Sequence, residues 1–399
     1  MRDEVVIGFG SQTGSAEAIA WRVFRLVASR LQGRMDANVV CLDDFDPVSC
    51  RFALFVVSTA GQGEVPDNMK VFWRNLLKKS APRLDSLQFS VFGLGDSSYP
   101  IYNAAARKLT QRLLDLGAEL FYPRELGDDQ DPMGYDKSVE PWARGVCDKI
   151  FSIALPSHVT SQIEEKTFHL YSVERLQSRE VALVDLQSLC FGSGVNRYSP
   201  FLAEVTENKR LTPEDHWQDV RHLEFDVEGS GIEYRPGDVL LLHCENDPGI
   251  IVPFIRNRIG LDPDQVIQVN ALYPGCFLFP KELSLRDLFC KFLDVLGTPK
   301  RHFFEVAANY AASEHEIERL RELASAEGSE DLNRYCFRER RTFIEVMEDF
   351  PSLDFPLAFF LDSIPTLKPR QFSISSSPLV RNTICLFIHA LRLMAIEST

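Results

Sequence analysis

The stretch VVIGFGSQTGSAEAIAWRVF, residues 5–24, decides the first part of the fold. It opens with a short apolar run typical of a buried parallel strand. Over residues 15–31 apolar residues recur every three or four positions, as on one face of a helix. Between them, Ser11, Thr13 and Ser15 offer hydroxyls beside the free N–H groups that open the helix. The stretch therefore predicts a strand, an anion-binding loop and a helix.

The same alternation continues through the first 150 residues. Further strand-like runs occupy 39–42, 52–58, 89–94 and 118–122, and further helical patterns occupy 69–79, 102–117 and 138–153. Repeated strand and helix units predict a doubly wound α/β sheet, in which ligands bind beyond the carboxyl ends of the strands.

Two more loops follow the third and fourth strands, STAGQGEVPDN at 58–68 and GLGDSSYPIYN at 93–103. Their glycines allow a flat ring to approach the backbone, and Tyr99 offers an aromatic face. The first loop lacks the Gly-Lys-Ser/Thr ending of nucleoside triphosphatases. A dinucleotide-binding dehydrogenase stays the alternative, because Gly8, Gly10 and Gly14 form a stretched G-x-G-x-x-G followed by acids at 43 and 44.

With all three loops present, the first half resembles the flavodoxin family, specifically the FMN domain of diflavin reductases. The resemblance implies a parallel sheet of order 2-1-3-4-5 over residues 1–150, with FMN at its carboxyl edge. It implies that Gly61 turns its peptide toward flavin N5 and that Tyr99 stacks on the ring, whose second face is less covered because Ala60 replaces a tyrosine of a relative. The implied FMN residues are Ser11, Gln12, Thr13, Gly14, Ser15, Ala16, Ser58, Thr59, Ala60, Gly61, Leu94, Gly95, Asp96, Ser97, Ser98, Tyr99, Pro100, Ile101, Tyr102, Asn103 and Asp129.

The second half changes character. Residues 151–198 predict a linker with one edge strand at 181–189, and residues 199–399 predict an antiparallel β-barrel interrupted by a helical insert at about 249–347. Near the end, RQFSISSSP at 370–378 alternates as a strand would.

This strand resembles the Arg-x-aromatic-Ser motif of the FAD-binding domain of diflavin reductases. The resemblance implies that Arg370 binds the FAD pyrophosphate, that Phe372 packs on the isoalloxazine, and that Ser373 is the catalytic residue near N5. The implied FAD residues are Arg340, Arg370, Gln371, Phe372 and Ser373.

Over nearly its whole length the chain resembles the branch of diflavin reductases that serves cytosolic iron–sulfur assembly. Members of that branch pass electrons from NADPH through FAD and FMN to the iron–sulfur protein anamorsin. Because only a short tail follows Ser373, we expect a truncated chain that lacks the NADPH domain and does not oxidise NADPH itself. An FMN-only electron carrier and a non-catalytic interaction protein stay as alternatives.

The amino-acid composition narrows the classes of partner that this chain is expected to bind. The net charge of −14 and the lack of a strongly basic run argue against nucleic acid. Nine cysteines show no zinc-ligand spacing and no disulfide framework, which favours a reducing cytoplasm and predicts no metal site. No apolar run reaches the length of a membrane span.

Overall fold

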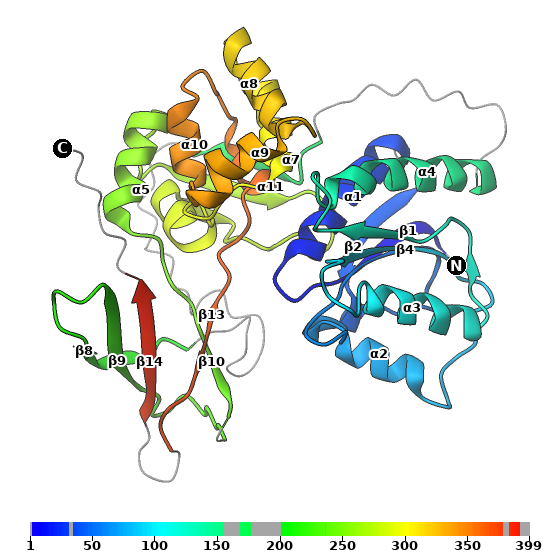
Figure 1. The fold of residues 1–399 in the computed structure, drawn as a ribbon, viewed down its shortest axis with the longest axis horizontal. Helices are drawn as coiled ribbons and strands as arrows, with labels where there is room; N and C mark the ends of the chain where they lie inside the picture. Colours follow the sequence, from blue (N-terminus) through cyan, green and yellow to red (C-terminus); the bar gives the residue numbers. More distant parts are fainter. Residues whose placement is uncertain are drawn as a thin grey trace. The chain divides into compact units, whose positions relative to one another are not determined.

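The structure is a computed structural model that describes residues 2–31, 35–154, 168–176, 201–235, 237–377 and 383–391. The chain divides into two compact units, whose helices and strands are labelled in Figure 1. The first comprises Met1–Ser172, Asn270–Leu278 and Leu296–Ser363, and the second comprises Val173–Val269, Phe279–Val295 and Ile364–Thr399.

A parallel sheet forms the centre of the first unit. Its strands are β1 (Arg2–Gly10), β2 (Asp36–Cys41), β3 (Cys50–Ser58), β4 (Gln88–Gly95), β5 (Glu119–Leu120) and β6 (Glu125–Asp128). The order is β2-β1-β3-β4-β5, which confirms the predicted topology. Residues 52–57 of β3 are fully buried, because helices cover both faces of the sheet.

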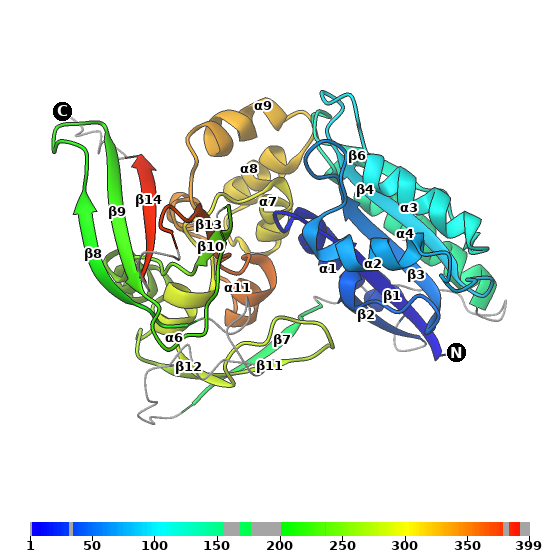
Figure 2. The same ribbon diagram turned by 90° about the horizontal axis from the view of Figure 1, so that it is seen from below.

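Four helices provide that cover. They are α1 (Ser15–Leu31), α2 (Lys70–Leu77), α3 (Ala104–Asp115) and α4 (Asp136–Ala154). Helices α1 and α4 lie on one face, whereas α2 and α3 lie on the other (Figures 1 and 2). Buried Ala16, Ala20, Val23 and Val27 form the apolar stripe that the sequence predicts for α1.

The fifth strand departs from the prediction of one run at 118–122. β5 ends at Leu120, and the chain returns to the edge of β4 only as β6. Pro123 lies in the interruption and has no N–H to donate to a sheet ladder. Its carbonyl instead accepts a hydrogen bond from Ser90 Oγ at 3.3 Å. The break brings Asp128 beside Gly95, at the carboxyl edge of the sheet.

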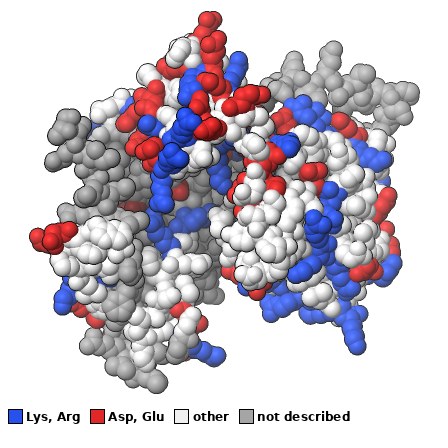
Figure 3. Space-filling view, viewed as in Figure 1, with Lys and Arg blue, Asp and Glu red and all other residues white. Residues whose placement is uncertain are grey.

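A layer of short helices completes the first unit. It contains α7 (Arg301–Ala307), η6 (Ala308–Tyr310), α8 (Glu314–Ala324), α9 (Ser329–Leu332), η7 (Asn333–Arg338), α10 (Phe343–Asp349) and α11 (Leu357–Ser363). Aromatic rings form its core: Phe355 stacks on Phe359 with centroids 4.0 Å apart, and Phe303 meets Phe343 edge to face at 4.9 Å. On the face of this unit seen in Figure 3, acidic and basic side chains are interspersed.

Aromatic contacts join α1 to segments far away in the sequence. The ring of Phe24 lies 5.9 Å from that of Phe168 and 5.1 Å from that of Tyr273. Gly275 has a φ of +82°, and a Cβ there would lie 2.1 Å from the Val39 carbonyl oxygen, so only glycine allows this close approach to β2. These contacts make the flavodoxin-like sheet and residues 270–278 parts of one unit.

Three antiparallel sheets account for the remaining strands. Their orders are β14-β9-β8, β10-β13 and β12-β11-β7. The strands are β7 (Tyr171–Arg175), β8 (Glu204–Arg210), β9 (Gln218–Asp226), β10 (Val239–Leu242), β11 (Val266–Ala271), β12 (Glu282–Ser284), β13 (Arg370–Ser373) and β14 (Thr383–Leu391). Figure 2 shows β8, β9 and β14 side by side. Antiparallel pairing is as predicted, but these sheets do not close into a barrel within the described ranges, and the expected edge strand at 181–189 lies outside them.

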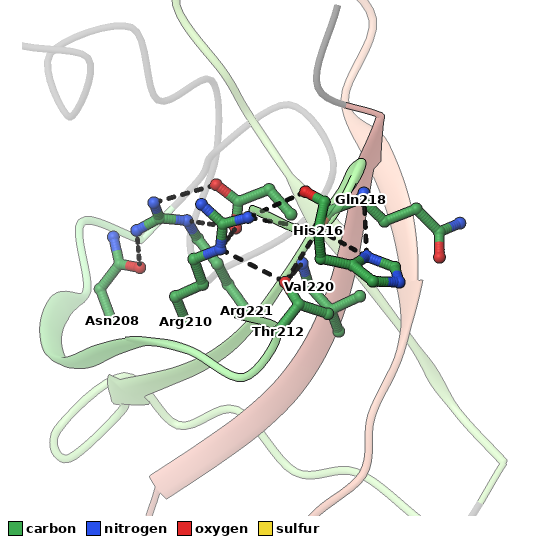
Figure 4. A network of polar contacts seen from close by, with 8 residues as sticks. Asn208, Arg210, Thr212, His216, Gln218, Val220 and Arg221 are labelled. Carbon is green, nitrogen blue, oxygen red and sulfur yellow. Dashed lines mark hydrogen bonds and ion pairs between the residues drawn. The ribbon is translucent and has the colours of Figure 1, made fainter. Parts of the chain in front are cut away.

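Polar side chains close the hairpin between β8 and β9 (Figure 4). Arg210 donates to Thr212 Oγ1 and to the carbonyls of His216 and Gln218, at 3.3 to 3.4 Å. Thr212 Oγ1 itself donates to the Gln218 carbonyl at 2.8 Å. The turn is therefore held by hydrogen bonds to its own backbone.

The expected helical insert is mixed rather than wholly helical. It begins with α5 (Pro248–Phe254), the π-helix η4 (Ile255–Ile259), α6 (Leu285–Asp287) and the π-helix η5 (Leu288–Phe292), and it includes the strands β11 and β12. The sequence VIQVNA of β11 alternates with period two and contains β-branched residues, which favour a strand. Among the described residues, no helix has the length and apolar character needed to span a membrane.

Candidate functional site

The carboxyl ends of β1, β3 and β4 open into the three loops that the sequence singles out. Ser58 Oγ donates to the Gly10 carbonyl at 3.2 Å, which ties the end of β3 to the end of β1. Thr59 N donates to the Leu94 carbonyl at 3.2 Å, which ties β3 to β4. The structure therefore brings the three predicted loops together at one edge of the sheet.

The first loop wraps the N-terminus of α1. Gly14 N donates to Ser11 Oγ at 3.0 Å, and Ser11 N donates to Asn68 Oδ1 at 2.8 Å. Gln12 and Thr13 are exposed. The Gln12 amide also exchanges hydrogen bonds with Asp67, whose N–H donates to Gln12 Oε1 at 3.0 Å. A loop with N–H groups and hydroxyls at the positive end of a 17-residue helix, exposed at Gln12 and Thr13, fits a phosphate.

The second loop makes a tight turn against the third. Ala60 N donates to the Glu64 carbonyl at 3.0 Å, and Gly61 and Gly63 both have positive φ. A Cβ on Gly63 would lie 2.6 Å from Ile101 Cγ2, so the second and third loops touch at this point. Gly61 stays exposed beside the contact.

The third loop carries uncovered apolar side chains. Tyr99 is 66% exposed and Ile101 is 46% exposed. Large apolar side chains standing free at a sheet edge are typical of a surface that covers a ligand. Together with the phosphate loop and the exposed Gly61, they fit a flat aromatic ring joined to a phosphate, as FMN is.

Two of the residues implied for FMN support this loop from beneath. The Tyr102 hydroxyl donates to the Leu126 carbonyl at 2.8 Å, and Asn103 Nδ2 donates to the Gly127 carbonyl at 3.0 Å. The side chain of Asn103 is fully buried. These bonds fix the loop against β6, and direct flavin contact at the two positions stays a prediction.

Sequence reasoning missed the role of Asp128. Its Oδ1 accepts from Ser97 N at 2.9 Å and from Gln130 N at 3.1 Å, which ties the third loop to the loop after β6. The hydrogen bond from Ser97 lowers the pKa of this carboxyl. Asp129, the residue implied for FMN, is exposed, and its backbone N–H donates to the Gly95 carbonyl at 2.9 Å. The run GDDQD at residues 127–131 was the sequence feature that could have indicated this role.

On β13, exposed and partly buried residues alternate from Gln371 onward, but Arg370 is exposed although it was expected on the same face as Phe372. Arg370, Gln371 and Ser373 are exposed, while Phe372 is partly buried and packs against the cluster around Phe225. β13 pairs with β10, where Phe372 is opposite Leu240. Burial raises the pKa of Asp294, and the charge of Arg370 opposes that shift. An exposed guanidinium and hydroxyl on one strand suit the pyrophosphate and ring of FAD.

Arg340 belongs to the other unit. It lies in the first unit, two residues after the end of η7, with a φ of +53°, whereas β13 lies in the second. Its contact with FAD stays a prediction.

One group of metal-ligand type was not anticipated. His222 Nε2 lies 3.0 Å from Glu224 Oε1 and 3.8 Å from Glu207 Oε2, on the paired strands β8 and β9. The side chain of Glu207 is 44% exposed. The hydrogen-bond distance between His222 and Glu224 and the cross-strand approach of Glu207 account for their grouping.

Two family models match the chain. One described as Flavodoxin matches residues 7–142, and one described as FAD binding domain matches residues 194–392. The proteins named NADPH-dependent diflavin oxidoreductase 1 from Bos taurus and Danio rerio are each 37% identical to the chain, over 390 and 391 residues. The protein of that name from Arabidopsis thaliana is 36% identical over 406 residues. In each case 94% of this chain aligns with 64% of the relative, so the chain spans less than two thirds of the length of these relatives.

The two matched domains coincide with the two sets of site residues, at the carboxyl edge of the parallel sheet and on β13. The flavodoxin match indicates FMN, and the second match indicates FAD. The chain therefore belongs to the diflavin oxidoreductase family, of which it carries a flavodoxin domain and an FAD-binding domain.

Proposed function

We propose that this chain is the flavin-carrying part of an electron-transfer protein of cytosolic iron–sulfur cluster assembly. In the whole protein, electrons pass from NADPH to FAD, then to FMN, and then to an iron–sulfur protein of the anamorsin type. The observation that carries the proposal is the match of one chain to both a flavodoxin and an FAD-binding family model, together with relatives named NADPH-dependent diflavin oxidoreductase 1.

When bound, FAD supplies two-electron chemistry toward a nicotinamide, and FMN supplies one-electron chemistry toward an acceptor. The N–H groups and hydroxyls of Ser11–Ala16 bind the FMN phosphate, and Tyr99 stacks on its ring. Gly61 can turn its peptide toward N5 because its backbone tolerates positive φ. On β13, Arg370 binds the FAD pyrophosphate and the Ser373 hydroxyl holds a proton near N5.

The antiparallel sheets supply the frame of the FAD site in this proposal. In this proposal the sheets are parts of a barrel that frames the FAD site, and the strand pairs β10-β13 and β9-β14 are the parts that the structure describes. The partly buried Phe372 then joins the interior cluster to the isoalloxazine face.

The decisive experiment measures flavin content. The full chain is purified, its flavins are released by heat, and FMN and FAD are quantified per chain. We expect one of each, with the FMN content lowered selectively in Tyr99→Ala and the FAD content lowered selectively in Arg370→Gln. FMN without FAD would favour an FMN-only carrier, and a chain that binds neither flavin would overturn the proposal.

The acceptor is tested separately. Photoreduced chain is mixed with an oxidised anamorsin-type protein, and reduction of its iron–sulfur cluster is followed by the loss of visible absorbance. Electron transfer within seconds is expected. Binding without cluster reduction would point to the interaction-protein alternative.

A further inference from the structure

The loop that leads into α1, residues 11–16, which we call the phosphate loop, contains no cationic side chain. Residues 8–17 include no lysine or arginine, and Glu17 adds an acid to the first turn of α1. A phosphate monoester carries a charge of about −1.5 to −2 at pH 7, so helix N–H groups and hydroxyls leave much of that charge unbalanced. A charge from elsewhere in the fold would complete the site.

Lys300 reaches the loop from the helical layer. Its Nζ donates to Ser15 Oγ at 3.0 Å, although the two residues are 285 positions apart. Lys300 is exposed and precedes α7, whereas Ser15 is the first residue of α1. Both residues belong to the first unit.

The neighbour of Lys300 anchors it to the same edge of the sheet. Arg301 is 8% exposed, and its Nη2 donates to the Pro132 carbonyl at 2.9 Å and to Ser329 Oγ at 2.9 Å. Ser329 Oγ donates to the same Pro132 carbonyl at 2.7 Å. Pro132 lies in the loop between β6 and α4, so the start of α7 is tied to the flavodoxin domain at the carboxyl edge of its sheet.

We propose that Lys300 is a binding residue for the FMN 5′-phosphate, so that the phosphate is held jointly by the flavodoxin domain and the helical layer. This inference rests on the proposed function. An ammonium group has three N–H donors, and a phosphate oxygen that accepts from Ser15 Oγ also lies within its reach. Lysine acts here as a flexible point charge, which suits a phosphate approached from one side.

The test compares FMN with riboflavin, which lacks the phosphate. Flavin-free full chain is titrated with each, and dissociation constants are obtained from the quenching of flavin fluorescence. Lys300→Gln should weaken FMN binding about three- to tenfold, as expected for a partly exposed charged hydrogen bond, and should leave riboflavin binding unchanged. Lys300→Arg should restore FMN binding. The effect on FMN should shrink in 0.5 M salt, where the Debye length is about 4 Å, compared with about 30 Å in 0.01 M buffer.

Lys149→Gln is the matched control, because it removes an exposed lysine on α4 and the same unit of charge. An unchanged FMN dissociation constant in Lys300→Gln, or an equal loss for riboflavin, would overturn this inference and leave the proposed function intact. A wild-type chain that binds neither flavin form would overturn both.

Discussion

Substitution of Phe24 by alanine tests the packing of α1 against segments that are distant in the sequence. Phe24 is fully buried, and its ring lies 5.4 Å from that of Trp21, 5.9 Å from that of Phe168 and 5.1 Å from that of Tyr273. Removing a buried phenyl ring from a core costs about 3–5 kcal/mol. Three edge-to-face contacts place this site at the upper end, so we expect the free energy of unfolding to fall by about 4–5 kcal/mol.

The assay is urea unfolding of the full chain, followed by far-UV circular dichroism and by hydrogen exchange. Phe89→Ala is the matched control, because Phe89 is also fully buried and its ring contacts Phe55 within the sheet. Both variants should lose stability, but only Phe24→Ala should first accelerate exchange in residues 270–278. A loss below about 1 kcal/mol for Phe24→Ala, or identical exchange in the two variants, would refute the reasoning.

Three further predictions concern single side chains. Tyr99→Ala should weaken FMN binding about tenfold and Tyr99→Phe less than twofold, because stacking depends on the ring, which fluorescence titration would check. Brief iodoacetamide labelling followed by mass spectrometry should modify the exposed Cys244 before Cys147, since burial raises the pKa of the Cys147 thiol to about 12; equal labelling would contradict this. The hydrogen bond from His302 and the charge of Arg22 lower the pKa of Glu305. Its ionised carboxylate therefore stabilises the folded state at pH values above the ordinary pKa of about 4.5. Glu305→Gln should therefore lower stability by up to about 1 kcal/mol at pH 7, and urea titrations should show this difference disappearing as the pH falls through the depressed pKa of Glu305.

The parallel sheet and its loops could be predicted because the signals are local. A strand buried on both faces is a continuous apolar run, and residues 52–57 show this directly. Parallel strands bring their carboxyl ends to one edge, so loops after different strands meet without further information. The bond from Ser58 to Gly10 and the contact of Gly63 with Ile101 are the outcome.

The packing of α1 against distant segments of the first unit could not be predicted, because it depends on residues far apart in the sequence. Periodicity marks Phe24 as buried but does not say that Phe168 and Tyr273 bury it. The helical patterns after residue 249 likewise carry no sign that Leu296–Ser363 groups with the flavodoxin domain. For the same reason Lys300 reads as an ordinary surface lysine before a helix, and only the fold places its ammonium at Ser15.

Within the first unit, the phosphate end and the ring end of the proposed FMN site differ in how far they are covered. The helical layer contacts the proposed phosphate end through Lys300, which donates to Ser15 Oγ, and it contacts the loop after β6 through Arg301, which donates to the Pro132 carbonyl. The layer also packs on α1, where Arg25 Nη2 donates to the Asp362 carbonyl. At the ring end, Tyr99 stays 66% exposed with that layer in place. In the proposed site, fixing the phosphate end would restrict the position of FMN, whereas an uncovered ring edge would let the proposed electron acceptor approach closely. Within the first unit, cofactor retention and access to the ring therefore depend on different residues, and substitutions at Lys300 and Tyr99 should separate them.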